Sequence, residues 1–483
     1  MSHTKPKVSQ HLKGSKIFSN SAWGLVASLL QNIFLSLFFV IIARSYTTTE
    51  FAHFLIANTL YQFVAAFAAF GLGQWFMREI VNTQSKKNLI HGFLKMQLYF
   101  GIVFFALNII LVFTLYDEYI IRVLSLLFGI NIIFDNLIYS IKHVNIAEFE
   151  QKKTFTILLI EATAKFGVGC LLFIFPMSII TLSALLIVLR FATLNLFLKI
   201  GSPKNIDLNG FWKIDIPYSY IKGIVFKNWP FVIIGSAYII YWRISIIIIS
   251  KILTLEDVAN YEISFKLFSI AQLVPAIVST TVFPTLVKLY KENHTLGFKE
   301  LYKKMYLLYS IFGLLSFTFI YSFGENILPF AFGESYATTA IFTQEMFLTI
   351  LVYPTVLLQA NVLIAMRMEK TDMWFNVLSV ILNITLCLIG LIFIKSLSVI
   401  NYSILISIFI FHVSQDYVLI KEKVTTIPEA INGFAMIVLT CSMYVLISDL
   451  INEYILFLSF SLLLLGLCYN KLKTNYKTTY SLR

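Results

Sequence analysis

The chain has 483 residues, of which 58% are hydrophobic and 13% are charged, and its mean hydropathy is +0.82. Soluble domains carry nearer a quarter charged residues, so this composition excludes a soluble globular protein and predicts an all-α polytopic membrane protein. The formal net charge of +12 would favour a nucleic-acid partner in a soluble chain. Membrane proteins concentrate Lys and Arg in their cytoplasmic loops, which explains the charge without any nucleic acid.

Fourteen apolar runs follow one another along the chain, and each is close to the roughly 20 residues that cross a bilayer as a helix. The links between them are short, so we expect about 14 transmembrane helices and no soluble domain. The longest link, 201–223, contains Pro203 and Pro217 and divides the runs into two sets. The predicted spans are 18–42, 52–75, 91–115, 119–141, 155–175, 178–200, 224–249, 259–285, 304–323, 340–365, 373–394, 398–419, 430–449 and 453–470.

Charge alternates along the links, with one side basic and the other acidic. Because Lys and Arg accumulate on the cytoplasmic side, the basic side is predicted to be cytoplasmic and to hold both termini. An even number of spans agrees with this arrangement. The basic links and tails lie near residues 5–16, 78–87, 142–153, 199–227, 288–304, 367–370, 421–423 and 471–483, and the acidic ones near 50, 117–118, 256–257, 325–334 and 449–453.

One short segment occurs twice. Residues 43–54 read ARSYTTTEFAHF after the first span, and residues 250–261 read SKILTLEDVANY after the seventh. The aligned positions share a small residue, a cation, a threonine, an acid, a second small residue and an aromatic residue. Self-similarity at equivalent positions predicts two structural halves, a layout that in membrane proteins is typical of transporters with a site between the halves.

Motifs for enzymatic chemistry are absent from the sequence. It contains no Gly-rich phosphate loop, no HExxH or GxSxG pattern and no cluster of Cys and His with metal-ligand spacing. Its four cysteines all lie in apolar runs and are interpreted as small core residues. We therefore predict a membrane transporter and not an enzyme, with no cofactor and no metal site.

Ionisable residues within the spans are the candidates for function, because a charged group is costly in lipid and must face a bundle interior or an aqueous cavity. Two i,i+4 pairs, Glu161–Lys165 and Glu262–Lys266, have the acid first, which is the favourable order on a helix. They either neutralise each other within their helix or contact a substrate or ion. The complete set is Asp135, Glu161, Lys165, Arg243, Glu262, Lys266 and Glu345.

Three of the remaining residues have two interpretations each. Arg243 has no carboxylate three or four residues away, so it is expected to meet an anion or a carboxylate on another helix. Asp135, beside Asn136, is either an ion site or part of a satisfied polar cluster. His412 lies within a span and is either a hydrogen-bonded packing residue or a proton relay.

Four segments resemble the bacterial polysaccharide flippases of the Wzx type, which belong to the multidrug/oligosaccharidyl-lipid/polysaccharide (MOP) exporter superfamily. ARSYTTTEFAHF resembles their Ala-Arg…Glu-Phe-Gly signature, and GLGQWFMREI at 71–80 resembles their Gly-Leu…Arg-Glu-Ile. VANYEISFKLF at 258–268 is similar to their eighth span, and residues 361–384 are similar to their junction between the tenth and eleventh spans. The similarity extends over nearly the whole chain, although each motif is loose.

The resemblance implies two six-helix lobes around a central cavity, at 1–200 and 224–419, joined by the cytoplasmic linker 201–223. Residues 420–483 then form two extra helices and a basic tail. It also implies a bacterial cytoplasmic (inner) membrane location and a lipid-linked oligosaccharide on undecaprenyl diphosphate as substrate, flipped for O-antigen, capsule or exopolysaccharide synthesis. Expected partners are membrane lipids, a polysaccharide polymerase and a chain-length regulator.

A diphosphate that crosses a bilayer needs cations along a protected path, and Arg suits bidentate phosphate contacts. Arg44 and Arg78 near the two membrane faces either serve that path or anchor helix ends at headgroups. One departure concerns coupling: many relatives have an acid just after the seventh-span Arg, where this chain has Ile244 and Ser245. The candidate substrate-binding cations are Arg44, Arg78, Lys165, Arg243 and Lys266, and the candidate ion-coupling acids are Asp135, Glu161 and Glu262.

Two other functions compete with this one. A multidrug or organic-cation antiporter of the same superfamily would need an acidic cavity with few cations, whereas the candidates here tilt positive. A membrane polysaccharide polymerase or glycosyltransferase usually needs a sizeable external loop with catalytic residues, and the external links of this chain are short.

Overall fold

A computed structural model describes residues 14–83, 85–148, 150–201 and 207–480, and within these ranges the regular structure is helical throughout. The chain divides into two compact units, Met1–Arg243 and Ile244–Arg483. This division falls inside one long helix and not in the linker, and the lobe boundaries inferred from the sequence remain a prediction.

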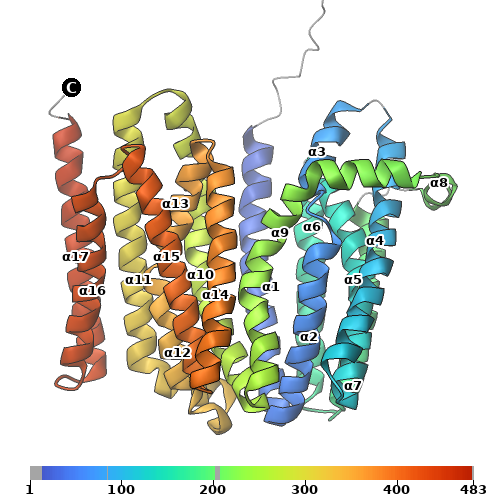
Figure 1. The fold of residues 1–483 in the computed structure, drawn as a ribbon, viewed down its shortest axis with the longest axis horizontal. Helices are drawn as coiled ribbons and strands as arrows, with labels where there is room; N and C mark the ends of the chain where they lie inside the picture. Colours follow the sequence, from blue (N-terminus) through green and yellow to red (C-terminus); the bar gives the residue numbers. More distant parts are fainter. Residues whose placement is uncertain (1–13, 84, 149, 202–206, 481–483) are drawn as a thin grey trace, which may run out of the picture. The chain divides into compact units, whose positions relative to one another are not determined.

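The first unit is a bundle of long helices with three shorter helical segments (Figure 1). The short helix α8 belongs to the predicted linker, and α9 continues from the first unit into the second. The elements are α1 (Gly14–Ser45), α2 (Thr48–Ala68), α3 (Gly73–Asn82), α4 (Lys86–Leu115), α5 (Tyr119–Ala147), α6 (Gln151–Leu171), α7 (Ile179–Leu196), the π-helix η1 (Phe197–Gly201), α8 (Leu208–Lys213) and α9 (Tyr218–Ile252).

The second unit is also a helical bundle, and α16 and α17 lie beside each other at its edge (Figure 1). Both carry exposed apolar side chains, such as Leu439, Leu446 and Leu462. The elements are α10 (Leu255–Lys291), α11 (Thr295–Phe332), η2 (Glu334–Tyr336), α12 (Thr339–Leu348), η3 (Thr349–Leu351), α13 (Tyr353–Ala365), α14 (Glu369–Phe393), α15 (Leu397–Lys421), α16 (Ile427–Ser448) and α17 (Glu453–Tyr480).

The prediction of an all-α polytopic membrane protein is confirmed. Within the described residues, twelve helical segments are long and apolar enough to cross a membrane, and the apolar part of α17, Glu453–Tyr469, is shorter. The predicted span 224–249 coincides with α9, so every one of the fourteen predicted spans falls on helical structure. Which side of the membrane holds the termini remains a prediction.

Two predicted spans are interrupted where the sequence suggested continuous helices. The span 52–75 ends as a helix at Ala68, because Phe70 and Gly71 adopt positive φ of 50° and 56° and turn the chain into α3. The span 340–365 is broken between α12 and α13 by the 3₁₀ turn η3, and Pro354 occupies the first turn of α13. Pro lacks the N–H of a helix interior but is tolerated at a first turn, which explains where α13 begins. By contrast, α10 runs unbroken through Pro275 and Pro284.

The repeated segment has the same local structure in both places. Thr47 caps α2 and Thr254 caps α10, each with its hydroxyl accepting from the backbone N–H three residues on, at 3.3 Å from Glu50 and 3.2 Å from Asp257. The carboxylates of Glu50 and Asp257 accept in return from the backbone N–H groups of Thr47 and Thr254. This reciprocal capping box requires a hydroxyl and an acid three residues apart, which explains why the sequence repeats them.

The turn between α1 and α2 is held by one further contact. The Tyr46 hydroxyl donates to the Met177 carbonyl at 3.0 Å, which joins this turn to the loop before α7. Burial, and then the charge of Glu50, raise the pKa of Tyr46 to about 12, so its hydroxyl keeps its proton and stays a donor at neutral pH.

Within each unit the helices pair in the same order. In the first unit α5, the fourth span, packs against α2, α4 and α7. In the second unit the broken tenth span, α12 with α13, packs against α10, α11 and α15. The fourth helix of each set therefore contacts the second, third and sixth, as expected from a structural repeat.

Each unit has its own apolar core at the end that the charge pattern predicts to be cytoplasmic. In the first unit Phe76 of α3 stacks on Phe93 of α4, with ring centroids 4.1 Å apart, inside a cluster that also includes Ile224 of α9. In the second unit Tyr302, Leu358 and Leu419 lie in a cluster between α11, α13 and α15.

Candidate functional site: a charged network in the first unit

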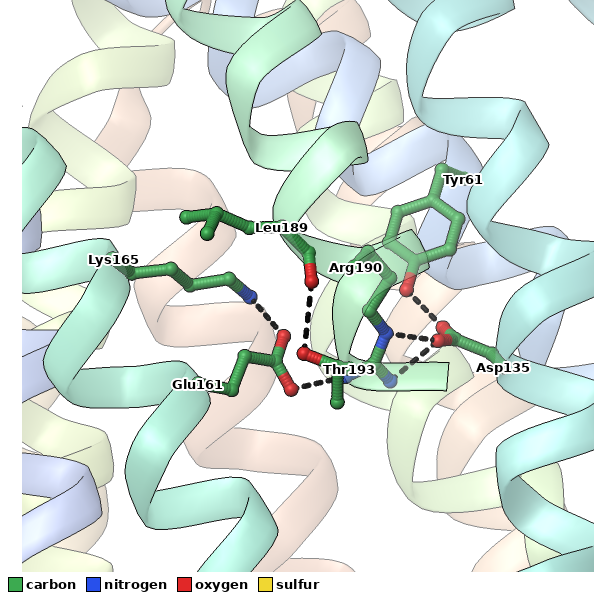
Figure 2. A network of polar contacts seen from close by, with 7 residues as sticks. All are labelled: Tyr61, Asp135, Glu161, Lys165, Leu189, Arg190 and Thr193. Atoms are coloured by element: carbon green, nitrogen blue, oxygen red, sulfur yellow. Dashed lines mark hydrogen bonds and ion pairs between the residues drawn. The ribbon is translucent and has the colours of Figure 1, made fainter. Parts of the chain in front are cut away.

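Four helices of the first unit contribute polar side chains to one connected network (Figure 2). Tyr61 comes from α2, Asp135 from α5, Glu161 and Lys165 from α6, and Arg190 from α7. Asp135, Glu161 and Arg190 each lie about 9 Å or more along their helix axis from the nearer helix end, by the rise of 1.5 Å per residue. The network therefore sits well inside the length of the spans.

Arg190 is the centre of this network. Its guanidinium contacts Asp135 through Nε and Nη2, at 2.7 and 2.5 Å from Oδ1, and Glu161 through Nη1, at 2.5 Å from Oε2. A planar guanidinium can bind two carboxylates at once because its five N–H donors point in fixed directions. One arginine of α7 thus holds α5 and α6 together.

The remaining carboxylate oxygens have partners of their own. Asp135 Oδ2 accepts a hydrogen bond from the Tyr61 hydroxyl, and Glu161 Oε1 lies 2.8 Å from Lys165 Nζ. The predicted i,i+4 pair of Glu161 and Lys165 is confirmed, but it is only one branch of a larger cluster. The Thr193 hydroxyl, also drawn in Figure 2, donates to the Leu189 carbonyl of its own helix and adds no further link to the charged groups.

The network is charge-balanced and partly open. Two carboxylates face two cations, which reduces the cost of placing them inside a membrane span. The Glu161 side chain is 5% exposed, whereas those of Arg190, Asp135 and Lys165 are 18%, 22% and 24% exposed. Lys142 lies two turns along α5 from Asp135. It is close enough to interact electrostatically with Arg190, Asp135 and Glu161. The cations of the network are therefore partly exposed, whereas its inner carboxylate, Glu161, is shielded.

Arg190 was not among the predicted site residues, although its position inside an apolar run is visible in the sequence. Arg190 interrupts the apolar run 178–200 and is the only Lys or Arg in it before Lys199. The i,i+4 rule that found the Glu161–Lys165 pair cannot find a residue whose partners lie 29 and 55 positions earlier. Asp135 was expected to be either an ion site or a member of an amide cluster. Asp135 has Arg190 and Tyr61 as partners, while the neighbouring Asn136 amide donates elsewhere, to the Ala68 and Gln97 carbonyls. The polar partners of Asp135 are therefore not the neighbouring amides, and its role as an ion site remains a prediction.

Two other predicted cations, Arg44 and Arg78, belong to helices that contribute no side chain to this network. Arg44 is exposed in the last turn of α1. Arg78 belongs to α3, not to a straight second span, and its side chain lies outside the described part of the chain. Their assignment to the substrate path remains a prediction.

The remaining predicted residues lie on α9, α10 and α12. Glu262 is buried and Lys266 half-buried on α10, and Arg243 is half-buried on α9. The predicted Glu262–Lys266 pair and the role of Arg243 remain predictions. Glu345 of α12 accepts a hydrogen bond from the Asn401 amide of α15 at 3.1 Å, so it is already held by a neighbouring helix.

The fold and the network define a polytopic helical membrane protein with a charged centre among its spans, and solved structures with the same fold are transporters. A multidrug resistance MATE family transporter of the MOP superfamily, in an inward-facing conformation, matches with a TM-score of 0.68 at 9% identity, covering 83% of this chain and 98% of that one. The lipid II flippase MurJ, in an inward closed conformation, matches with a TM-score of 0.69 at 13% identity, covering 93% and 99%. At such low identity these likenesses show the fold alone.

The family follows from the sequence itself. The model of the family described as polysaccharide biosynthesis protein matches residues 17–290, more than half of the chain, and the chain therefore belongs to this family. The family resemblance drawn from the short motifs is thereby confirmed. No curated protein matches the chain.

Proposed function

We propose that this protein is a flippase that moves an oligosaccharide linked to a polyprenyl diphosphate across the cytoplasmic membrane of a bacterium, for the synthesis of a surface polysaccharide. The observation that carries the proposal is the Arg190 network, a buried but accessible set of cations and acids in a chain of the polysaccharide biosynthesis family. The fold shared with the lipid II flippase MurJ is consistent with it. O-antigen, capsule and exopolysaccharide remain equal candidates for the polymer served.

The network can bind and release a diphosphate without leaving any of its charged side chains unpaired. Arg190 and Lys165 contact Glu161 and Asp135 in the absence of substrate. A diphosphate brings two or more negative charges and competes for the same N–H donors, since phosphate oxygens and carboxylates have similar geometry toward a guanidinium. The displaced carboxylate takes up a proton, because an unpaired carboxylate is costly at this depth.

Asp135 is the acid best placed for that exchange. Its carboxylate is 22% exposed, compared with 5% for Glu161, and the Tyr61 hydroxyl already bonds its second oxygen. Protonation of Asp135 releases Arg190 toward the substrate, and loss of the proton restores the ion pair. In this scheme Asp135 and Glu161 couple proton movement to substrate binding, Lys165 and Arg190 bind phosphate, and Lys142 adds a cation nearby.

The remaining parts of the proposal come from the sequence. Arg44, Arg78, Arg243 and Lys266 extend the cationic path, and Glu262 is a further coupling acid. Both termini face the cytoplasm. A polysaccharide polymerase and a chain-length regulator act on the flipped product.

The test uses the purified full-length protein in liposomes that contain a fluorescent oligosaccharide on undecaprenyl diphosphate. Flipping is measured as the fraction of labelled lipid that an impermeant reductant or lectin reaches with time. Wild-type protein should accelerate flipping, and Arg190→Lys should retain only part of the rate, because a point charge replaces a planar fork that binds two carboxylates.

A matched control is available in the same unit. Arg122 pairs with Asp117 at 2.8 Å near the start of α5, where the Asp117 side chain is fully exposed. Arg122→Lys makes the same chemical change outside the network and should leave the rate within about twofold of wild type, as for an exposed ion pair. Equal rates for Arg190→Lys and Arg122→Lys would exclude Arg190 from the transport path.

A multidrug or organic-cation antiporter is the second candidate, favoured by one observation: the chain shares its fold with MATE family transporters. The same liposomes separate the two functions. Proton-driven uptake of an organic cation, without acceleration of lipid flipping, would favour the antiporter.

A further inference from the structure

The second unit contains a buried acid–base pair that the proposed function does not use. His412 and Asp416 are one turn apart on α15, and Nδ1 of the imidazole lies 3.0 Å from Oδ2 of the carboxylate. Their side chains are 1% and 9% exposed. Gln359 of α13 is fully buried. Its side-chain amide nitrogen donates to the other oxygen of Asp416 at 2.6 Å. The same nitrogen donates to the Tyr302 hydroxyl of α11 at 3.4 Å.

Asp416 needs a counter-charge, because an ionised carboxylate is not stable in a buried site without a cation or a full set of donors. Within the described residues, the only basic group within ion-pair distance of Asp416 is His412. An imidazole supplies a positive charge only after it binds a proton. The pair is therefore electrically neutral when one of its two side chains binds an added proton, and negative without it.

The second nitrogen of His412 is also informative. Nε2 is buried and, like Nδ1, makes no hydrogen bond within the described structure, so the contact of Nδ1 with Asp416 is an ion-pair distance alone; the Tyr306 hydroxyl beside the ring also has no hydrogen-bond partner there. The imidazole is flanked by the rings of Tyr306 and Phe434, at centroid distances of 6.1 and 5.2 Å and with interplanar angles of 67° and 87°. Both contacts are edge-to-face ring contacts, so the two aromatic rings pack around the imidazole and leave Asp416 as its charged neighbour.

A cavity connects this pair with the end of the bundle. It has a volume of about 320 Å³ and lies between α11, α15 and the start of α16, with Asp416, Tyr302 and Tyr306 in its wall. Asp416 is five residues from the end of α15, about 8 Å along the axis, and the basic residues Lys303 and Lys304 also line the cavity. Water in such a space gives the carboxylate an exchange path for protons at the face predicted to be cytoplasmic.

We propose that His412 and Asp416 form a proton-binding site of the second half, which holds one exchangeable proton and passes it to and from the cavity through the Asp416 carboxylate. The proton leaves as hydronium, so that no covalent bond other than O–H or N–H changes. The site is separate from the Arg190 network and lies wholly in the second unit.

Other charged and titratable groups face this site from each neighbouring helix. They shape its electrostatics but do not replace the pair, because their own partners hold them: Lys303 lies 2.6 Å from Glu429, and Asp372 accepts from Gln415 at 2.7 Å. The full set is Tyr302, Lys303, Lys304 and Tyr306 on α11, Asp372 on α14, and Glu429 on α16, whereas α13 contributes the neutral Gln359.

The first experiment measures proton binding directly and needs no substrate. Purified protein in detergent is titrated between about pH 5 and 9, and the protons bound are counted against a buffer blank. Asp416→Asn removes no histidine, yet it should release one proton fewer than wild type, because His412 loses its counter-charge and stays neutral in its buried site. The Asn amide can still bond both His412 and Gln359, so the variant should fold.

Asp117→Asn is the matched control, since the Asp117 side chain is fully exposed and pairs with Arg122 at the protein surface. An exposed carboxylate has lost its proton below about pH 5, so the control should give the wild-type count. If Asp416→Asn also gives the wild-type count, the proposal is wrong. His412→Gln with Asp416→Asn provides a second folded variant, which should give the same reduced count as Asp416→Asn alone.

The second experiment tests whether this proton drives transport, and this part rests on the proposed flippase function. Flipping in liposomes is measured with and without a pH gradient. Wild-type flipping should respond to the gradient, and Asp416→Asn should flip at one gradient-independent rate. An unchanged gradient response in Asp416→Asn would overturn the coupling role. If the wild-type protein does not flip the lipid at all, the proposed function fails, and the proton count still decides the site.

Discussion

The two polar clusters occupy corresponding places in the two halves of the chain but differ in chemistry. In the first unit the sixth span, α7, contributes Arg190, which meets Asp135 on the fourth span. In the second unit the corresponding span, α15, contributes His412 and Asp416, which meet Gln359 on α13 of the tenth span. Arginine is charged at every physiological pH, whereas histidine changes its charge near neutrality.

Under the two proposals made above, the two clusters have different roles. A permanent cation with two acidic partners suits the exchange of one anion for another. An imidazole–carboxylate pair with a single counter-charge suits the gain and loss of a proton. The repeat has therefore kept the helix pairing and changed the side chains, so each cluster should respond to mutation in its own way.

The largest expected effect is that of Arg190→Ala. It leaves Asp135 and Glu161 without their shared cation, and breaking a buried ion pair by removing one partner costs about 3–5 kcal/mol. The protein should nearly disappear from the membrane, measured by immunoblot. Arg190→Ala combined with Asp135→Asn and Glu161→Gln should restore its abundance but not lipid flipping. Normal abundance of the single variant would contradict the structural role of the network.

His412→Gln should come next. It removes the counter-charge of Asp416 but affects one carboxylate instead of two, and this carboxylate can still be protonated from the cavity. We expect the purified variant to unfold at a lower temperature than wild type, because the buried carboxylate has lost its counter-charge. Thermal unfolding, compared with that of His412→Gln/Asp416→Asn, measures this. A double variant as destabilised as the single one would rule out Asp416 as the responsible group.

The close approach of the third and fourth spans in each half gives the third prediction. A Cβ added at Gly313 of α11 would lie 2.6 Å from the Ile350 carbonyl oxygen, and one at Gly101 of α4 would lie 2.9 Å from the Ile133 Cα. Because backbone atoms cannot rotate away, Gly313→Ala and Gly101→Ala should each destabilise the protein by about 1–3 kcal/mol, as overpacking does. Thermal melts in detergent should show it, with Gly167→Ala, where a Cβ meets nothing within 4 Å, as the unaffected control.

The smallest expected effect concerns the two capping boxes. Thr47→Ala and Thr254→Ala each remove one hydroxyl that accepts from a helix N–H, at a cost of about 1 kcal/mol. The two losses should be equal within error if the segments are true structural counterparts. Thermal melts of both single variants, with Thr47→Ser and Thr254→Ser as controls that keep the cap, make the comparison.

Sequence predicted the features that are local or that depend on composition. The helical spans follow from run length, and the Glu161–Lys165 pair follows from spacing on one helix. The helix break before Pro354 was not predicted, because apolar residues continue through it without a change in hydropathy. The contacts of Arg190 and Gln359 were not predicted, because their partners are remote in the chain and a single sequence carries no signal for contacts between distant helices.

The order in which the charged residues leave the ribosome has a consequence for biogenesis. Asp135 precedes Arg190 by 55 residues. At roughly 5–20 residues synthesised per second, about 3–11 seconds pass between the synthesis of Asp135 and that of Arg190, which neutralises it. During that interval the nascent chain must keep Asp135 protonated, or shelter it within the insertion machinery, because free hydrocarbon would penalise its charge. A nascent chain that stops after α6 would thus contain one acid, Asp135, without its cation, whereas Glu161 already has Lys165 on its own helix; a membrane protease could recognise an unfinished molecule by that acid.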